Sequence, residues 1–396
     1  MTLVLNQVTT LFLAIALLTL GMLLVKKVGF LKKFCIPAPV VGGLLFAIFA
    51  TIFKSLGWLE ITLDTSLQSL FMLTFFTTVG LGASFKLIKL GGKLLVIYWL
   101  ACGFLALAQN TIGVSMAYLF DLHPLIGMMA GAVSMEGGHG AATAFGQTIE
   151  DLGIQSALSI GIAAATFGLV AGGLVGGPTV KYLISKHNLK PSEIDDGIGM
   201  PVGETEKPIQ TDAFFTQILL ITLCMAVGTY LGDLFSAATG FVLPGYVGAM
   251  FVAVIVRNIM DKLNPKTVDM KGIGLISDVS LGIFLSMALM SIKLWEVADL
   301  ALPLLIIVFV QVVFIVLFGI FVLFRLLGKN YDAAIMVAGF TGHGLGATPN
   351  AMANMAAVTE RFGPSRTAFL IVPIVGAFLI DVFAIPIIIT TINLFH

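Results

Sequence analysis

Two apolar, glycine-rich segments hold the residues that are best suited to chemistry. The first spans roughly 124–150 and the second roughly 332–360, and each combines many glycines with scattered hydroxyl, amide and histidine side chains. Glycine permits unusual backbone dihedral angles and lets a ligand approach the main chain closely. We therefore expect the backbone of these segments to bind a small ligand.

The binding chemistry follows from broken helices. Exposed N–H groups at the start of a half-helix attract anionic groups, and free carbonyls at the end of one can hold a sodium ion. The tip of the first segment runs from Ser134 to Thr143, and that of the second from Thr341 to Asn350. Hydroxyl and amide oxygens in these tips are suited to a hard cation such as sodium.

An alternative interpretation is that these glycines only allow helices to pack closely, as small residues do in any membrane protein. A single Gly-Gly-His-Gly run would favour that interpretation. Here Gly138-His139-Gly140 recurs as Gly342-His343-Gly344, which favours binding. One histidine in each loop, without a cluster of cysteines or carboxylates, argues against a metal site. A hydrogen-bonded structural role or a role in substrate gating fits better.

Ionisable residues inside apolar segments are costly and mark function. Asp381 lies deep in an apolar run and is suited to an ammonium group or sodium, or to a hydrogen bond between helices. Glu136 at the first tip is a second candidate. Arg361 follows the second segment, and its planar fork could grip a carboxylate, although it could equally anchor a helix at the membrane interface.

These considerations give two sets of candidate residues. The predicted substrate-binding residues are Ser134, Gly137, Gly138, His139, Gly140, Thr341, Gly342, Gly344, Arg361 and Asp381. The predicted sodium-binding residues are Thr143, Gly346, Ala347, Thr348, Asn350 and Asn354. We predict no catalytic residues and no metal besides sodium.

The elements that must position these residues lie in lipid. The chain has 396 residues, of which 58% are hydrophobic and only 11% are charged, and its mean hydropathy is +1.06. A soluble domain needs roughly a quarter of charged residues. The net charge is zero, and long basic runs, which would indicate nucleic-acid binding, are absent. The three cysteines stand far apart and predict neither a disulfide framework nor a metal site.

Ten apolar runs are long enough to cross a membrane. They lie near 11–25, 37–53, 66–85, 94–120, 157–180, 213–235, 243–260, 273–292, 300–327 and 366–393. The two glycine-rich segments read instead as re-entrant hairpins, because irregular backbone inside a membrane must be buried in protein or line a wet cavity. The predicted fold class is an all-α membrane protein.

The order of elements is the same in both halves of the chain. We predict an N-terminal repeat at 1–185 with hairpin 124–150, a cytoplasmic linker at 186–212, and a C-terminal repeat at 213–396 with hairpin 332–360. Because each repeat has five spans, an odd number, the second repeat must cross the membrane in the opposite orientation to the first. With both termini outside, every Lys and Arg except Lys54 and Lys293 falls on the cytoplasmic side, as basic residues generally do.

The sequence resembles the bacterial sodium/glutamate symporter family essentially from end to end. The resemblance is carried by IPAPVVGGLL at 36–45, ATFGLVAGGLVGGP at 165–178, GKNYDAA at 328–334, GLGATPNAMANM at 344–355 and TERFGPS at 359–365. The first loop of the family often reads SGGHGT, and here Glu136 and Ala141 take the flanking places.

The resemblance implies sodium-coupled uptake of L-glutamate across the bacterial inner membrane, and related sodium/citrate carriers imply a homodimer with an elevator motion. A sodium- or proton-coupled carrier of another di- or tricarboxylate, such as citrate, is the closest alternative. A channel would place rings of like charge along a pore, and an enzyme would need a nucleophile–base pair. The sequence offers neither.

Overall fold

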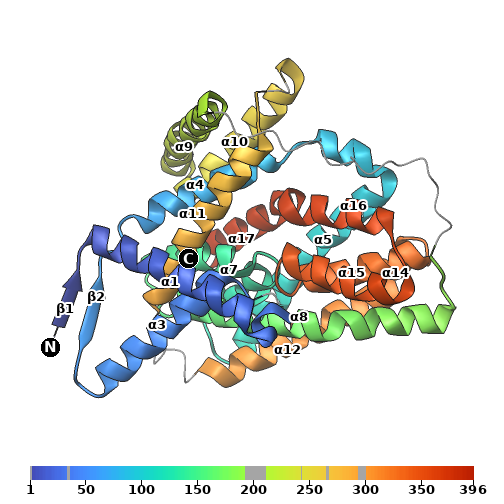
Figure 1. The fold of residues 1–396 in the computed structure, drawn as a ribbon, viewed down its shortest axis with the longest axis horizontal. Coiled ribbons are helices and arrows are strands. Elements are labelled where there is room, and N and C mark those ends of the chain that lie inside the picture. The colour runs from blue at the N-terminus through green and yellow to red at the C-terminus, as the bar shows by residue number, and fades with distance from the viewer. Residues whose placement is uncertain (1, 34–35, 192–210, 242, 265–266, 293–299) are drawn as a thin grey trace.

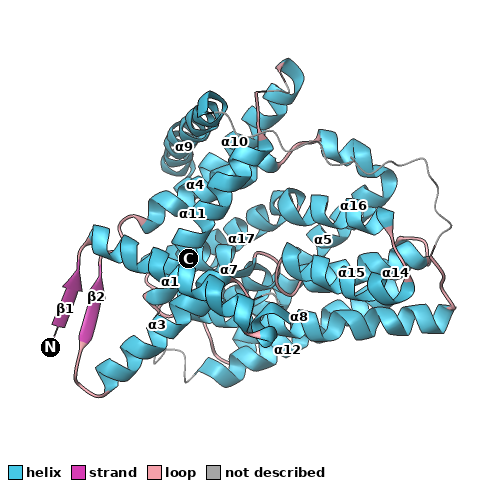
Figure 2. Ribbon diagram, viewed as in Figure 1, coloured by secondary structure: helices cyan, strands magenta, loops and turns pink. Residues whose placement is uncertain are grey.

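The computed structural model describes residues 2–33, 36–191, 211–241, 243–264, 267–292 and 300–396. Helices dominate it (Figure 2). The α-helices are α1 (Gln7–Lys27), α2 (Gly29–Lys33), α3 (Ala38–Ser55), α4 (Gln68–Gly82), α5 (Lys86–Leu119), α6 (Pro124–Met128), α7 (Gly138–Asp151), α8 (Ala157–His187), α9 (Thr211–Thr239), α10 (Gly245–Leu263), α11 (Met270–Met290), α12 (Ala301–Phe318), α13 (Phe324–Leu326), α14 (Tyr331–His343), α15 (Thr348–Phe362), α16 (Arg366–Ile374) and α17 (Asp381–Phe395). Three π-helical turns are η1 (Met129–Val133), η4 (Gly319–Leu323) and η5 (Val375–Leu379).

One feature was not predicted, a pair of short strands beside the helices. Strands β1 (Thr2–Leu5) and β2 (Glu60–Leu63) pair in parallel, with Thr2 opposite Glu60. They pair because α1 and α3, which follow and precede them, pack side by side. Lys54 forms an ion pair with Glu60 at 2.9 Å, and its hydrogen bond and charge hold the pKa of the Glu60 carboxyl below its ordinary value. Four-residue strands are too short to leave a pattern in the sequence.

Seven helices of the described chain are long and apolar enough to span a membrane, compared with the ten predicted spans. The other three differ for physical reasons. Helix α4 has only 15 residues. Helix α10 carries Arg257, Asp261 and Lys262 near its end. The predicted span 366–393 is divided by the π-helical turn η5 into α16 and α17. The predicted linker 186–212 falls mostly on residues 192–210, outside the described residues.

The helices form two groups (Figure 1). The frame group consists of α1, α3, α4, α9, α10 and α11, and the hairpin group consists of α5–α8 and α12–α17. Within the frame group, α1 packs on α3 as α9 packs on α10, and α3 packs on α11 as α10 packs on α4. Among the described residues, only narrow contacts, such as α7 with α11 and η5 with α4, join the two groups.

The two helix pairs of the frame group pack in the same way, through glycine. A side chain at Gly21 or Gly42 would collide with the backbone of the facing helix in the α1–α3 pair. Gly228 and Gly248 have the same constraint in the α9–α10 pair. Small residues let membrane helices approach closely, so these glycines fix the two pairs.

A polar network fixes the junction at which the chain passes from the frame group to the hairpin group. Arg257 and Asp261 of α10 form a largely buried ion pair at 3.3 Å. The Ser84 hydroxyl donates to the Asp261 carboxylate, and the Lys86 ammonium donates to the Asp261 carbonyl. Beyond this junction, Gly92 interrupts α5 with φ 56° and ψ −149°, a conformation that is essentially restricted to glycine.

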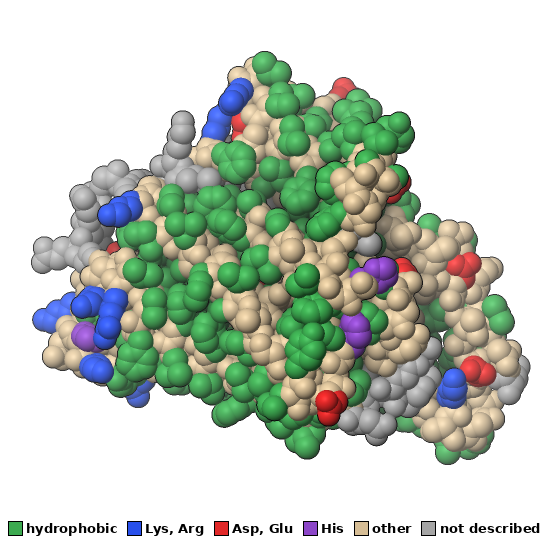
Figure 3. Space-filling view, turned by 180° about the vertical axis from the view of Figure 1, so that it is seen from behind, with side chains coloured by type: hydrophobic (Ala, Val, Ile, Leu, Met, Phe, Trp, Pro, Cys, Tyr) green, Lys and Arg blue, Asp and Glu red, His purple; other side chains and the backbone are tan. Residues whose placement is uncertain are grey.

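The outer surface is apolar, as expected for a chain that faces lipid. On one face of the molecule, hydrophobic side chains are spread widely among the backbone and other side chains, and Lys and Arg gather near its edges (Figure 3). Exposed large apolar residues recur along the frame and hairpin groups, including Phe12, Leu100, Leu219 and Phe309. The free thiols of Cys102 and Cys224 are buried.

Candidate functional site

The first glycine-rich segment is broken in its middle. The part of the segment before the break, α6 and η1, contains Gly131 in a non-helical conformation. The Ser134 hydroxyl lies within hydrogen-bonding distance of the carbonyls of Met129 and Gly161. A turn at Glu136 and Gly137 follows, and α7 starts at Gly138, whose φ of +59° favours glycine. Ser134 therefore stabilises the irregular backbone before the break.

The second glycine-rich segment is also broken. Helix α14 ends at His343, residues 344–347 form a turn, and α15 starts at Thr348 and packs against α14. The side-chain amide of Gln109 in α5 donates to the Gly344 carbonyl at 2.7 Å, and that of Gln311 in α12 donates to the Gln109 carbonyl. These mid-membrane amides bond across helices, as expected for such residues.

The two breaks meet through their backbones. A Cβ atom placed on Gly138 would lie 2.6 Å from the Gly346 carbonyl oxygen. Gly346 in turn packs against Leu169 of α8. The contact brings the first turn of α7 against the turn that precedes α15, so the two half-helices begin near the same place.

The repeated Gly-His-Gly motif does not occupy equivalent places in the two breaks. Gly138-His139-Gly140 begins the helix after the first break, whereas Gly342-His343-Gly344 ends the helix before the second break. A side chain at Gly342 would collide with Ala351 of α15. The second copy therefore serves helix packing, and the structural counterpart of 138–140 is the stretch that begins α15.

A cavity of about 970 Å³ lies between the two helix groups, at these breaks. Its frame wall comes from α1, α4 and α11 and from the start of α3, and its hairpin wall comes from both breaks and from the η5–α17 junction. The predicted site residues that line it are Gly137, Gly138, His139, Gly140, Ala347, Thr348 and Asp381. Several lining residues are exposed, including Thr19 and Asp278, so the cavity opens to the surface.

The start of α7 presents backbone donors to this cavity. The first N–H groups of any helix lack an acceptor within that helix, and Gly138, His139 and Gly140 all line the cavity. At the start of α15, by contrast, Pro349 has no N–H to offer. The α7 end is therefore the better of the two cradles for an anionic group.

The side chain of His139 is fixed by a neighbouring helix. Its Nε2 lies 3.0 Å from the Thr166 hydroxyl oxygen. That hydroxyl donates its single hydrogen to the Ile162 carbonyl, so Thr166 must accept from His139. This assignment places the proton on Nε2 and leaves Nδ1 as the acceptor of the neutral ring.

Two acidic residues lie on the hairpin wall, one at the first break and one at the η5–α17 junction. Glu136 is only 6% exposed, and neither of its oxygens has a hydrogen-bond partner. Asp381 begins α17, directly after the π-helical turn η5. The Trp99 indole donates to the Leu379 carbonyl of that turn at 2.6 Å. Among the described residues, no group of three or more His, Cys, Asp or Glu could hold a metal ion.

The remaining predicted site residues do not line the cavity. They are Ser134, Thr143, Thr341, Gly342, Gly344, Gly346, Asn350, Asn354 and Arg361. The Thr341 hydroxyl donates to carbonyls of its own helix, and the Thr143 hydroxyl is buried without a partner. The amides of Asn350 and Asn354 donate to Leu169 and Gly172 of α8, at 3.1 Å each, so both residues hold α15 against α8.

Arg361 lies far from the other predicted residues. It is exposed, and its guanidinium lies over the Phe362 ring. Arg361 follows Thr348 by thirteen positions in α15, a rise of about 20 Å at 1.5 Å per residue. The structure therefore does not bring this arginine to the cavity.

Sequence reasoning missed the frame wall of the cavity. Asp278 of α11 faces it together with Phe75 and Thr78 of α4. Asp278 lies inside the predicted span 273–292, so the signal that identified Asp381 was also present there. Gly376 was missed as well. It lines the cavity, and a Cβ there would lie 2.6 Å from His343 Nδ1 and 2.8 Å from Thr348 Oγ1.

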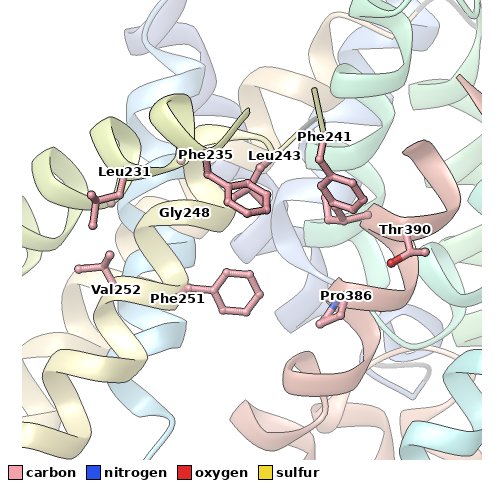
Figure 4. Close-up of a pocket in the computed structure, with 12 residues that line it drawn as sticks. Leu231, Phe235, Phe241, Leu243, Gly248, Phe251, Val252, Pro386 and Thr390 are labelled. Carbon is pink, nitrogen blue, oxygen red and sulfur yellow. The ribbon is translucent and has the colours of Figure 1, made fainter. Parts of the chain in front are cut away.

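A second cavity, of about 400 Å³, lies between the same two helix groups. Its lining is apolar and comes from α9, α10 and their connection on one side, including Phe235, Phe241 and Phe251, and from α17 on the other, including Pro386 (Figure 4). It contains no predicted site residue. Protein interiors have few voids larger than a water molecule, so the two groups are incompletely packed against each other.

Comparisons with known proteins agree with the family expected from the sequence. Residues 3–364 match the family model described as Sodium/glutamate symporter. The chain is 46% identical over 385 residues to the sodium/glutamate symporter of Escherichia coli (strain K12), covering 96% of this chain and 95% of the relative. It is 43% identical over 378 residues to that of Haemophilus influenzae, covering 94% and 93%.

A solved structure gives a weaker likeness. The sodium proton antiporter MjNhaP1 from Methanocaldococcus jannaschii, at pH 8, aligns over 98% of both chains with a TM-score of 0.44 and 15% sequence identity. A likeness at this level carries no argument about the site. The family-model match and the two close relatives, in contrast, extend over nearly the whole chain, and the chain belongs to the sodium/glutamate symporter family.

Proposed function

We propose that this chain is a sodium-coupled symporter that imports L-glutamate across the bacterial inner membrane by alternating access. The observation that carries the proposal is the meeting of two broken helices at a cavity between two helix groups. Family membership supplies the substrate and the ion, because the relatives are named for sodium and glutamate.

The proposed binding mode uses the charges of glutamate. A substrate carboxylate binds the free amides at the start of α7, at Gly138, His139 and Gly140. The ammonium group binds Asp381, which faces the same cavity, and His139 Nδ1 is available as a further acceptor. Backbone donors and one carboxylate thereby bind groups of opposite charge on the same molecule.

The proposed sodium ligands are oxygens at and behind the second break. Gly346 and Ala347 have carbonyls at the second break, of which the Ala347 carbonyl also accepts from the Asn350 and Ala351 amides, and Thr348 offers a hydroxyl at the cavity wall. Asn350 and Asn354 donate through their amide nitrogens to α8, which leaves their carbonyl oxygens for an ion. The unpartnered Thr143 hydroxyl is a further candidate. Oxygen ligands of this kind are those that hard cations prefer.

The proposed motion is an elevator in which the hairpin group moves against the frame group. Narrow contacts and two cavities between the groups support it. The equivalent packing of α1–α3 and α9–α10 supports two inverted repeats, with re-entrant hairpins at the two breaks. The placement of both termini outside the membrane stays a prediction from the distribution of basic residues. The homodimer implied by the family resemblance stays a prediction, and the mass of the detergent-solubilised protein tests it.

Uptake by proteoliposomes tests the proposal. Labelled L-glutamate should accumulate when sodium is outside and choline is inside, and should not accumulate when choline replaces sodium on both sides. A proton gradient alone should not drive uptake, and citrate should not compete. Equal uptake in choline would reject the coupling to sodium, and competition by citrate would favour the di- or tricarboxylate carrier.

A further inference from the structure

The Glu136 carboxylate is buried without compensation. The side chain is 6% exposed, it lines the large cavity, and neither oxygen has a hydrogen-bond partner. An ionised carboxylate that is removed from water is strongly destabilised unless hydrogen bonds or a cation compensate for the lost hydration. In its ionised form this residue, on the turn between η1 and α7, therefore requires a partner that none of the described residues provides.

Helix capping does not provide that partner. A carboxylate near a helix start usually accepts from the first free N–H groups. Helix α7 begins directly after Gly137, yet no side chain caps it and no N–H donates to Glu136. The amides of α7 thus remain free for another ligand, and the carboxylate remains free for a cation.

The charges of the cavity also favour the binding of a cation. Its described lining includes three acidic residues, Glu136, Asp278 and Asp381, and no lysine or arginine, and the two oxygens of Glu136 lie buried behind the cavity surface. A site of this charge would repel a substrate that carries two carboxylates and one ammonium group. Binding of such a substrate therefore needs a cation that first neutralises part of the cavity.

We infer that Glu136 binds a sodium ion at the first break and that this ion must bind before the anionic substrate. This inference rests on the proposed function, since it assigns a residue to the coupling of sodium and glutamate. Oxygens suited to the same ion lie on the same wall of the cavity, at the hydroxyl of Thr348, and beside Gly138, at the carbonyl of Gly346. Loss of the Glu136 charge should weaken sodium binding, and through it substrate binding at low sodium.

The test compares Glu136→Gln with the wild-type protein and with a matched control. Glu136→Gln removes the charge and keeps the size. Asp233→Asn makes the same chemical change on the exposed face of α9, outside both cavities between the helix groups. Binding of labelled L-glutamate to purified protein is measured against sodium concentration. Glu136→Gln should raise the half-saturating sodium concentration about tenfold and lower the steepness of the curve, whereas Asp233→Asn should match the wild type.

A second variant covers the case in which Glu136→Gln does not fold, as judged by size-exclusion chromatography. Glu136→Asp keeps the charge on a shorter side chain and should shift the half-saturating sodium concentration by less than Glu136→Gln. If only Glu136→Asp can be measured, the inference is supported when its half-saturating sodium concentration rises by well below tenfold and its binding curve is as steep as that of the wild type. A shift of tenfold or more with a shallower curve contradicts it, because the charge would then not be what matters.

The outcomes separate this inference from the proposed function. Wild-type protein that binds glutamate equally well without sodium would overturn both. A sodium-dependent wild type, with an unchanged sodium curve in Glu136→Gln, would overturn only the role of Glu136. Loss of a pH dependence in Glu136→Gln, with the sodium curve unchanged, would also overturn it, because the carboxylate would then take a proton instead of sodium.

Discussion

Substitution of Gly138 by alanine tests whether the contact between the two breaks builds the site. The residue has a φ of +59°, and its missing side chain leaves room for the Gly346 carbonyl oxygen. A left-handed conformation costs a non-glycine residue about 1–2 kcal/mol. The new Cβ would also lie 2.6 Å from that backbone oxygen, so the two turns must move apart.

The clash can be separated from the conformational cost. Overpacking of this kind costs about 1–3 kcal/mol, so Gly138→Ala should destabilise the protein by about 2–5 kcal/mol in all. Gly153 has a φ of +95°, and no atom lies within 4 Å of the place that a Cβ would take, so Gly153→Ala carries only the conformational cost. Gly177 has open space and no positive φ, and Gly177→Ala should be nearly neutral.

The assay pairs thermal unfolding in detergent with sodium-driven uptake of labelled glutamate. The unfolding temperature should fall in the order Gly177→Ala, Gly153→Ala, Gly138→Ala. Uptake should fall at least about tenfold only in Gly138→Ala, since a loss of 1.4 kcal/mol in substrate binding corresponds to a factor of ten. Gly138→Ala protein with the unfolding temperature and uptake of Gly153→Ala would refute the argument that this contact shapes the site.

The other predictions concern the charges of the site and the junction between the helix groups. Asp381→Asn should raise the half-saturating glutamate concentration in uptake by about tenfold or more, and an unchanged value would remove this residue from the site. Arg361→Ala should leave uptake near that of the wild type, because the side chain is exposed and far from the cavity, and a large loss would restore the contact expected from the sequence. Gly92→Ala should lower stability by about 1–3 kcal/mol through backbone strain alone, since its surroundings are open, and an unchanged unfolding temperature would contradict this. Arg257→Ala should cost about 3–5 kcal/mol, because Asp261 would stay buried without its partner, and Arg257→Ala together with Asp261→Asn should recover part of that loss in the same unfolding assay.

The sequence was a good guide where a pattern reflects the surroundings of a helix. Long apolar runs predicted the helices, and glycine with polar residues predicted both breaks, because lipid and irregular backbone leave strong signals in composition. Asp381 was predicted from the cost of a carboxylate inside an apolar run, and it lines the cavity. The seven predicted residues that line the cavity all belong to these features.

The features of the fold and the site that could not be predicted from the sequence depend on contacts between residues far apart in the chain. The repeated Gly-His-Gly motif suggested two equivalent tips, but the break falls before the first copy and after the second. The position of the break in the second half depends on Gly342, which lets α15 approach α14 closely. The frame wall was missed because Phe75 and Thr78 are ordinary residues for a membrane helix. Arg361 does not line the cavity because it lies near the far end of the 15-residue helix α15.

The meeting of Gly138 with Gly346 also constrains how the protein is made. It closes a loop of about 200 residues, a separation at which chain closure is entropically unfavourable before other contacts form. The first break is synthesised and inserted long before its counterpart exists. A nascent chain that lacks the second break has only part of the proposed ion site, so we expect an unfinished copy in the membrane not to bind sodium there.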